Sequence, residues 1–280
     1  MKIENFQLQT TTPQQFDTII DVRSPTEYAE DHMPGAINLP VLSDQEREIV
    51  GKLYKQESKF EAKKIGARFV SDNISKHLSG VLAEKGDQWK ALIYCWRGGQ
   101  RSRSLSVVLS EIGWQTQILE GGYKSYRRMI VDSLYQKPIK HNLIVVSGYT
   151  GTGKTTVLQK LAKLGAQVID LERLANHRGS IFGSRASGQP SQKEFESQIA
   201  ALLEHFSEKL PVFLEAESNQ IGYIKLPPSL WQKMKISPQI ELHSKIEERA
   251  EFLVGEYPDL YENTKSLHHK IELLSDFHSK

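Results

Sequence analysis

One stretch decides the fold of the C-terminal half of the chain: LIVVSGYTGTGKTT, residues 143–156. Its first four residues are apolar and predict a buried strand, and the residues from Lys154 onward have a helical pattern. Between them, Gly148 to Thr155 fits the spacing Gly-x4-Gly-Lys-Ser/Thr. A strand, a glycine-rich turn and a helix in this order predict the phosphate-binding loop of a P-loop α/β domain.

The residue types in this loop suit phosphate chemistry. Glycines let successive backbone N–H groups face an anion, and the helix that follows adds its positive N-terminal end. Lys154 supplies a mobile cation and is a catalytic candidate, while the Thr155 hydroxyl is a candidate Mg²⁺ ligand. The predicted phosphate-binding residues are Gly148, Gly151, Gly153, Lys154, Thr155, Thr156 and Arg178. A glycine-rich turn without a ligand is the alternative.

Two further candidates lie downstream of the loop. Arg178 belongs to a stretch over 177–192 that is rich in Gly, Ser and Arg, and loops of this length usually carry function or move. Glu215 ends an apolar strand, where P-loop proteins place an acidic residue near the metal. We expect Arg178 to reach a phosphate oxygen and Glu215 to join Thr155 around Mg²⁺. A solvated arginine and a water-facing carboxylate are the alternatives.

Upstream, short apolar runs alternate with helical patterns. Strands are predicted over 18–22, 36–40, 90–95 and 114–119, with two polar helices within 44–85. Such alternation favours a parallel sheet covered by helices on both faces. A polar connector around Pro138 precedes the P-loop strand, so we expect two α/β domains, one over 1–136 and a P-loop domain over 137–280.

Cys95 lies where the strongest predicted strand ends and a glycine-rich loop begins. The amides at the start of the next helix, together with Arg97, Arg101 and Arg103, are expected to favour the thiolate, which is the reactive form of cysteine. Gly98 and its glycine neighbour let the loop curl so that N–H groups face the sulfur. We therefore predict a site for a persulfide, a selenide adduct or an oxyanion, with Cys95, Arg97 and Arg101 as catalytic residues. A buried cysteine that only packs is the alternative.

Composition and charge narrow the function classes. The chain of 280 residues has a net charge of only +2, so nucleic-acid binding has to rest on local clusters of cations. The predicted RNA-binding cluster is Lys124, Arg127 and Arg128 on one helix, beside two tyrosines that could stack on bases. The alternative is a solvated basic face.

The single cysteine excludes an internal disulfide and points to a reducing compartment. The first residues do not have the pattern of a secretory signal, and no run approaches the roughly 18 apolar residues of a membrane span. We expect a cytoplasmic protein without a membrane partner. The histidines show no metal-ligand spacing with cysteine, which argues against a zinc site.

Three segments of the first half resemble rhodanese-type sulfurtransferase domains. They are DVRSPTEY with HMPGAINLP (residues 21–28 and 32–40), YCWRGGQRS (residues 94–102) and EGGY (residues 120–123). The gap of five residues between Cys95 and Arg101 is longer than in most single-domain rhodaneses and equals that of cysteine phosphatases. The resemblance implies an α/β chain with a rhodanese-like parallel-sheet domain, followed by a P-loop NTPase-like α/β domain.

The order of these domains, with LANHRGS at residues 174–180, is similar to the tRNA 2-selenouridine synthase family. The resemblance implies a selenotransferase acting on tRNA, with geranyltransferase activity. It would use geranyl diphosphate and selenophosphate as substrates and no covalently bound cofactor. An S-geranyl-2-thiouridine would form in the anticodon region and be converted to 2-selenouridine. The partners implied are tRNA and a selenophosphate-producing enzyme. The resemblance also implies a longer C-terminal part, so we expect 137–280 to be a shorter or truncated P-loop domain.

Three other readings remain open at this point. The P-loop spacing alone is also compatible with a nucleotide-dependent kinase or ATPase that carries a regulatory rhodanese module. The five-residue gap after Cys95 is also compatible with a cysteine phosphatase. A non-catalytic scaffold that binds RNA and uses Cys95 to carry selenium to a partner is the third.

Overall fold

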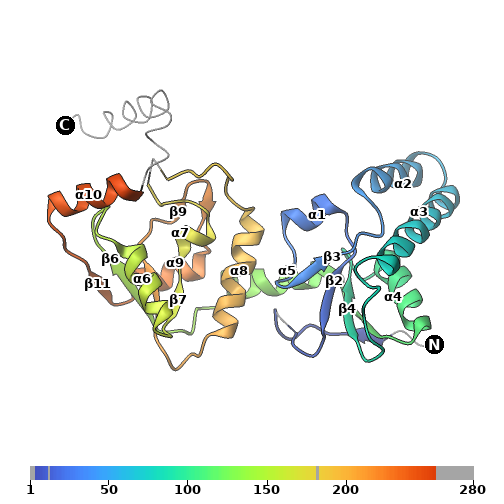
Figure 1. Cartoon of the computed structure of the whole chain (residues 1–280), viewed down its shortest axis with the longest axis horizontal. Coiled ribbons are helices and arrows are strands. Elements are labelled where there is room, and N and C mark those ends of the chain that lie inside the picture. Colours follow the sequence, from blue (N-terminus) through green and yellow to red (C-terminus); the bar gives the residue numbers. More distant parts are fainter. Residues whose placement is uncertain (1–3, 12, 181–182, 257–280) are drawn as a thin grey trace. The chain divides into compact units, whose positions relative to one another are not determined.

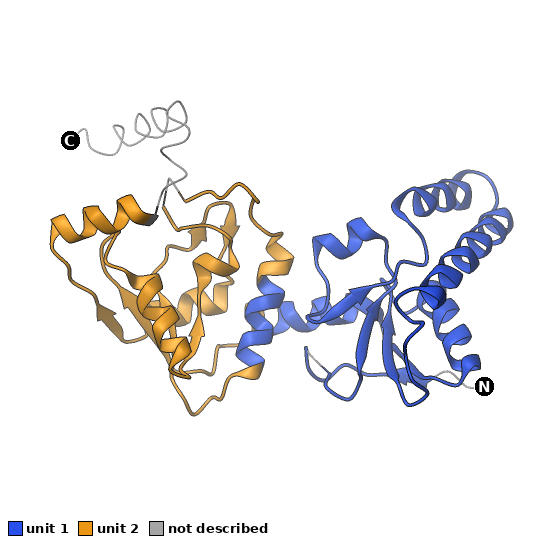
Figure 2. Cartoon of the chain, viewed as in Figure 1, with its two compact units in different colours: residues 1–133, 196–204 blue, residues 134–195, 205–280 orange. Residues whose placement is uncertain are grey.

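The computed structural model describes residues 4–11, 13–180 and 183–256. The chain divides into two compact units, which are coloured separately in Figure 2. Unit 1 comprises residues 1–133 and 196–204, and unit 2 comprises residues 134–195 and 205–280. The main change of unit lies close to the boundary expected at 136/137, whereas the assignment of 196–204 to unit 1 has no counterpart in the sequence analysis.

Unit 1 is built on a five-stranded sheet of order β1-β5-β4-β2-β3, in which every pair of neighbours is parallel (Figure 1). Its strands are β1 (Glu4–Phe6), β2 (Thr18–Asp21), β3 (Ala36–Asn38), β4 (Lys90–Tyr94) and β5 (Gln115–Leu119). Its helices are α1 (Pro25–Glu30), α2 (Asp44–Gln56), α3 (Lys59–Ser79), α4 (Gln100–Ile112) and α5 (Gly122–Val131). A π-helical turn, η1 (Asp132–Gln136), follows α5.

The central strands of unit 1 form because their apolar runs are buried on both faces. Ala91, Leu92, Ile93 and Tyr94 of β4 all have 0% exposure, as expected for the middle of a parallel sheet. Helix α4 packs against β4 and β5, and α3 packs against α2 and α4. Because all strands run in one direction, the loops that follow β2 and β4 meet at the same edge of the sheet.

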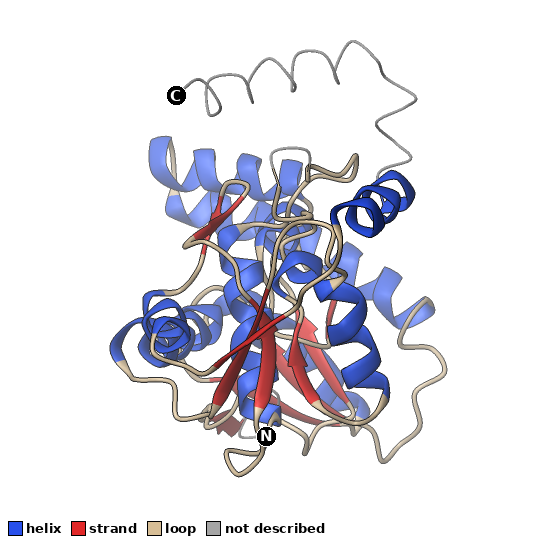
Figure 3. Cartoon of the chain, turned by 90° about the vertical axis from the view of Figure 1, so that its left-hand side faces the viewer, coloured by secondary structure: helices blue, strands red, loops and turns tan. Residues whose placement is uncertain are grey.

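Unit 2 has a four-stranded parallel sheet of order β11-β6-β8-β7, seen as red arrows among blue helices in Figure 3. Its strands are β6 (Leu143–Ser147), β7 (Gln167–Ile169), β8 (Val212–Glu215) and β11 (Gln239–Glu241), with a separate hairpin of β9 (Gln220–Ile221) and β10 (Ile224–Lys225). The helices that begin in this part of the chain are α6 (Lys154–Lys163), α7 (Leu171–Leu174), α8 (Gln192–His205), α9 (Pro228–Lys235) and α10 (Ile246–Glu256).

The sheet of unit 2 has helices on its faces. Helix α6 packs against β7 and β8, and α9 packs against β6. The expected order of strand, loop and helix around the P-loop is present as β6, residues 148–153 and α6. The α/β class predicted for both halves is therefore confirmed. Among the described residues, no helix is both long and apolar enough to cross a membrane.

Candidate functional site

Cys95 directly follows β4, and its sulfur is held by donors from the loop and the start of α4. The Gly99 N–H donates to Sγ at 3.2 Å, and the Ser102 hydroxyl lies 3.3 Å from Sγ. Burial alone would raise the pKa of this thiol. The pKa nevertheless lies below its ordinary value, because the Ser102 hydroxyl and backbone amides of Ser102, Arg97 and Gly99 stabilise the thiolate. The loop is therefore a cradle for a negatively charged sulfur.

The EGGY segment, residues 120–123, leads into α5 and holds the cysteine loop in place. At the start of α5, the Tyr123 N–H donates to the Cys95 carbonyl at 2.8 Å, and the Lys124 N–H donates to the Trp96 carbonyl at 3.0 Å. Gly122 has φ +60° and lies so close to the loop that an added Cβ would be 2.3 Å from the Cys95 carbonyl oxygen. Only glycine combines this conformation with this contact. The EGGY motif therefore holds the backbone of the Cys95 loop in place.

The arginines near Cys95 do not surround the sulfur as expected. The Arg101 guanidinium donates to Glu27 of α1 at 2.7 Å, and Arg47 contacts the same carboxylate at 3.0 Å. The Arg97 side chain is exposed, so this residue supports the sulfur through its backbone amide. Amides and a hydroxyl, and not guanidinium groups, carry the stabilisation of the thiolate.

A buried ion pair lies at the end of β2, the strand that pairs with β4 next to Cys95. Arg23 and Asp21 are 1% and 0% exposed and form an ion pair at 2.6 Å. The Arg23 guanidinium also donates to the Asp31 carbonyl at 2.6 Å and lies 3.8 Å from the centre of the Tyr123 ring. Asp21 and Arg23 thus support the cysteine loop through packing on Tyr123.

The P-loop of unit 2 has the geometry of an anion nest. Gly148, Gly151 and Gly153 all have positive φ, and the Lys154 ammonium donates to the Gly148 carbonyl at 3.0 Å. The loop opens on a cavity of about 350 Å³. All seven predicted phosphate-binding residues line this cavity, together with residues that the sequence analysis did not name: Gln159, Glu172, Ser180, Arg185, Glu217, Phe252 and Leu253 among them.

The carboxylates that line this cavity do not include the predicted one, Glu215. Glu215 is fully buried, does not line the cavity, and accepts a hydrogen bond from the Glu172 N–H at 2.6 Å. Glu172 and Glu217 line the cavity instead, and Glu172 accepts from the Thr155 hydroxyl at 3.2 Å. Glu172 is therefore the carboxylate bonded to Thr155, and Glu217 lines the same cavity, because the residue at the strand end is buried in the protein.

Glu172 and Glu217 lie close enough to affect each other. An added Cβ at Gly179 would be 2.7 Å from a carboxylate oxygen of each of them. Burial and the neighbouring Glu172 carboxylate raise the pKa of Glu217 to about 7, and burial also raises the pKa of Glu172. Two carboxylates in one buried place resist double ionisation, so this pair takes up a proton near neutral pH.

Helix α10 lies beside the mouth of the P-loop. The Arg249 guanidinium donates to the Thr150 carbonyl at 2.9 Å and lies 4.9 Å from the centre of the Tyr149 ring. An added Cβ at Gly151 would meet the Arg249 carbonyl at 2.8 Å, so α10 touches the loop backbone. Phe252 and Leu253 give this side of the cavity an apolar wall. No pattern around residues 246–256 had indicated this contact.

The predicted RNA-binding residues separate into two groups. Lys124 and Arg128 are exposed on α5. Arg127 is 14% exposed, and its guanidinium forms an ion pair with the buried Glu196 at 2.5 Å and lies 3.7 Å from Asp31. Arg127 is thus engaged inside unit 1, which corrects its assignment to the RNA-binding cluster. Both tyrosines of this helix are also buried and do not present rings to a base.

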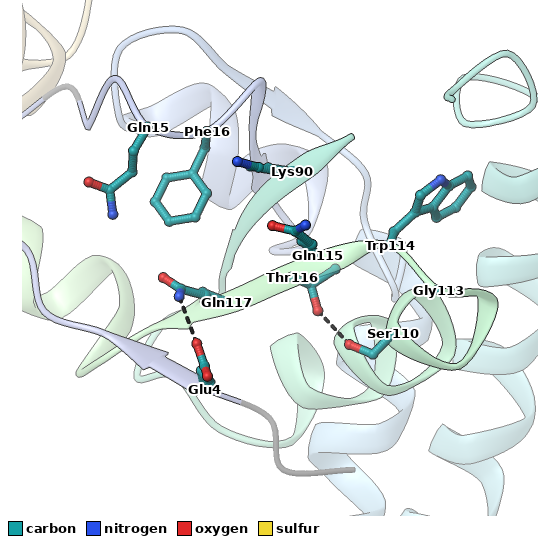
Figure 4. Close-up of a pocket in the computed structure, with 10 residues that line it drawn as sticks. All are labelled: Glu4, Gln15, Phe16, Lys90, Ser110, Gly113, Trp114, Gln115, Thr116 and Gln117. Atoms are coloured by element: carbon teal, nitrogen blue, oxygen red, sulfur yellow. Dashed lines mark hydrogen bonds between the residues drawn. The ribbon is translucent and has the colours of Figure 1, made fainter. Parts of the chain in front are cut away.

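A second cavity, of about 550 Å³, lies elsewhere in unit 1 (Figure 4). It is lined by the starts of β4 and β5, including Lys90 and Gln115, and Gln117 there donates to Glu4 at 3.0 Å. Cys95 follows the opposite, carboxyl end of β4. Ligands of open α/β sheets bind at the carboxyl ends of the strands, so this cavity is not part of the cysteine site.

The fold and these two sites define a class: a rhodanese-like domain joined to a P-loop domain. Residues 7–129 match the model of the "Rhodanese-like domain", and residues 141–279 match that of the "tRNA 2-selenouridine synthase AAA domain". A tRNA 2-selenouridine synthase of Sulfurovum sp. (strain NBC37-1) is 36% identical over 258 residues, which cover 90% of this chain and 69% of that protein. The chain therefore belongs to the tRNA 2-selenouridine synthase family.

Two other comparisons describe the extent of the similarity. The tRNA 2-selenouridine synthase of Marinobacter nauticus is 36% identical over 249 residues, which cover 85% of this chain and 65% of that protein. The chain thus spans a little under two thirds of that relative. The N-terminal domain of a putative ATP/GTP binding protein from Clostridium difficile 630 is 37% identical, with 46% of this chain and 99% of that domain covered and a TM-score of 0.40.

Proposed function

We propose that this chain carries a tRNA selenotransferase activity that replaces the sulfur of a wobble 2-thiouridine by selenium, through an S-geranyl intermediate. The observation that carries the proposal is the amide-lined cradle around Cys95, in a chain of this family that also has a complete P-loop. Both proposed donors, geranyl diphosphate and selenophosphate, present phosphate groups. The amide-lined Cys95 loop and the P-loop are both sites that suit the anionic phosphate groups of these donors.

We assign the alkylation step to the P-loop. The sulfur of the base forms a bond to the geranyl carbon while the carbon–oxygen bond breaks, and its electron pair leaves with the diphosphate. Negative charge grows on that oxygen, so donors aimed at it stabilise the transition state more than the ground state. Lys154 and the amides of 148–153 are such donors, and nothing in their geometry requires a nucleoside.

A magnesium ion fits the residues beside Lys154. The Thr155 hydroxyl and the carboxylates of Glu172 and Glu217 are hard oxygen ligands of the kind that Mg²⁺ prefers, and all three line the cavity. When bound, such an ion would neutralise phosphate charge. The shared proton of the two carboxylates has to leave before they act as ligands together. Arg178, on the same cavity, is the further cation that we assign to the phosphates.

We assign the selenium step to Cys95. In that step the selenium of selenophosphate forms the new bond to the base, and the geranyl thiolate leaves with the electron pair of the carbon–sulfur bond. Water then takes the phosphoryl group as the selenium–phosphorus bond breaks, which releases phosphate and leaves 2-selenouridine. The cradle of Gly99, Ser102 and Arg97 amides suits an anion held at the loop. We further propose that Lys124 and Arg128, exposed on the helix that carries the Cys95 loop, contact tRNA phosphates. A selenophosphate-producing enzyme is the proposed source of the donor.

Two variants separate the steps. Cys95→Ala should accumulate S-geranyl-2-thiouridine and lose 2-selenouridine, because only the selenium step uses the thiol. Lys154→Ala should lose about 10²–10³ in the rate of geranylation, the usual cost of removing one such donor, yet still convert pre-geranylated tRNA. Nucleoside masses are measured after incubation with thiolated tRNA, geranyl diphosphate and selenophosphate, without ATP.

The controls test the rival activities. Arg173→Ala changes an exposed cation near the P-loop that does not line the cavity, and it should behave as wild type. The proposal fails if wild type requires ATP for geranylation, if Lys154→Ala geranylates normally, or if Cys95→Ala makes selenouridine at the normal rate. Release of phosphate from a phosphotyrosine mimic would instead favour a cysteine phosphatase, although Glu27 holds the Arg101 that such an enzyme would need.

A further inference from the structure

A cavity of about 460 Å³ lies within unit 1, where α2, α3 and α4 meet. Each of these helices contributes lining residues three or four positions apart, which places them on one helix face. Most of the lining side chains are apolar, and they include Leu42, Val50, Tyr54, Ala67, Val70 and Val107. Tyr54 is 47% exposed and Val107 is 43% exposed. The cavity thus offers apolar surface, in a volume usual for small-molecule sites, to a ligand that enters from solvent.

This cavity begins next to the cysteine loop. Gln100, the first residue of α4, lines the cavity and directly follows Gly99 in the chain. The Gly99 N–H donates to the Cys95 sulfur at 3.2 Å, and consecutive Cα atoms are only about 3.8 Å apart. A group bound in the cavity is therefore close to the loop to which we assign the selenium step.

The charged residues at the cavity are all cations. Lys63 of α3 and Arg101 and Arg103 of α4 line it, and none of the described residues that line it is acidic. Arg101 is held by Glu27, whereas Lys63 and Arg103 are exposed. Cations beside an apolar surface favour an apolar group that is attached to a chain of phosphates over a neutral hydrocarbon or an acid-free protein segment.

We propose that this cavity binds the geranyl group of S-geranyl-2-thiouridine in tRNA and so presents the alkylated base to the Cys95 loop. The inference rests on the proposed function and names a subsite for its intermediate. That intermediate is an apolar chain on a polyanion, which matches the apolar lining and the neighbouring cations. A tRNA with unmodified 2-thiouridine has no group to place in the cavity. Burial of the geranyl group thus selects the alkylated tRNA for the selenium step.

Binding of two matched RNAs tests the proposal without turnover. One anticodon stem-loop carries S-geranyl-2-thiouridine and the other carries S-methyl-2-thiouridine, and both are titrated with the full chain in the absence of selenophosphate. Fluorescence anisotropy of a label on the RNA gives the two Kd values. Each buried CH₂ group strengthens binding about fourfold, so burial of about three or four of them gives roughly a hundredfold preference for the S-geranyl RNA.

Two variants change the cavity, and each has a matched control. Ala67→Phe fills the cavity from α3, and Val107→Asn adds an amide to its lining on α4. Both should lower the preference for the S-geranyl RNA about tenfold, and both positions are exposed, so the fold tolerates the change. Ser75→Phe and Ile112→Asn make the same changes at exposed positions of the same helices that do not line the cavity. These controls should keep the wild-type preference.

The outcomes separate this inference from the proposed function. Equal Kd values of the wild type for the two RNAs overturn the geranyl site, and so does an unchanged preference in either folded cavity variant. If Ala67→Phe does not fold, Val107→Asn decides alone. A preference lost in Leu253→Asn but kept in Val107→Asn would assign the geranyl group to the P-loop cavity, which also overturns the inference. A cavity-dependent preference in a chain that makes no selenouridine would refute the proposed function while keeping the geranyl site.

Discussion

Replacing Gly122 by alanine tests how the cysteine loop is held. The new methyl group would lie 2.3 Å from the Cys95 carbonyl oxygen, 2.5 Å from the Gly98 nitrogen and 2.8 Å from the Arg97 nitrogen. All three are backbone atoms, so no side chain can rotate away to make room. The loop itself has to move, and the hydrogen bond from the Tyr123 N–H to Cys95 has to lengthen.

The expected loss of stability has two parts. Alanine at φ +60° costs about 1–2 kcal/mol, the penalty of a left-handed conformation for a residue with a Cβ. Displacing a packed backbone adds about 1–3 kcal/mol, as for other overpacked sites. We therefore expect Gly122→Ala to lower the free energy of unfolding of unit 1 by about 2–5 kcal/mol. The pH midpoint for alkylation of Cys95 by iodoacetamide, which reports its thiolate, should also rise, because the amides that donate to the sulfur move.

Urea unfolding provides the assay, and a second glycine provides the control. In a Trp231→Phe background, tryptophan fluorescence reports unit 1 through its three other tryptophans. Gly35 has φ +76° and no atom within 4 Å of an added Cβ, so Gly35→Ala should lose only the 1–2 kcal/mol of the conformational part. Equal losses in the two variants, with wild-type alkylation of Cys95, would refute this account of the loop.

Three further predictions concern charge. Changing Lys124 and Arg128 together to alanine should reduce the slope of log affinity for tRNA against log salt concentration by about 1.4. An unchanged slope would show that these two residues do not contact tRNA phosphates. Arg127→Ala should lower the free energy of unfolding by about 3–5 kcal/mol, because it leaves the Glu196 carboxylate buried without its cation; a normal urea midpoint would contradict this. The pKa of Glu217, about 7 in the folded chain against an ordinary 4.5, means that the folded chain holds an extra proton between these values. Stability should therefore fall as pH rises from 4.5 through 7, and Glu217→Gln should weaken this dependence in urea unfolding, since Glu172 and Glu215, whose pKa values burial also raises, remain; an unchanged dependence would refute it.

Much of the fold was predictable because the signals were local. Strands β4 and β6 are apolar runs that end in glycine-rich loops, and their burial in parallel sheets requires little more than that pattern. Strand β11 was not predicted, because Gln239–Glu241 is short and exposed and pairs only with β6, nearly a hundred residues earlier. The contribution of 196–204 to unit 1 was missed for the same kind of reason, since its partners are distant in sequence.

The sites were predictable as loops but not as sets of side chains. The P-loop spacing names Lys154 and Thr155, but it does not indicate that a four-residue helix, α7, brings Glu172 to the Thr155 hydroxyl. The sequence of α5 does not distinguish Arg127 from its exposed neighbours, because its partner Glu196 lies 69 residues away and helical periodicity does not indicate such a contact. Ser102, whose hydroxyl lies 3.3 Å from the Cys95 sulfur, was not among the predicted residues. Its spacing of seven residues from Cys95 is the signal that could have indicated it.

The pairing of β1 with β5 affects how the chain is made. Glu4 of β1 lies beside Gln117 of β5, 113 residues later, so β1 leaves the ribosome long before the strand with which it pairs. Parallel pairing over such a distance is intrinsically slow to form. Gly122 and Tyr123, which fix the Cys95 loop, emerge later still. The contacts that lower the pKa of Cys95 can therefore form only after this part of the chain has been made.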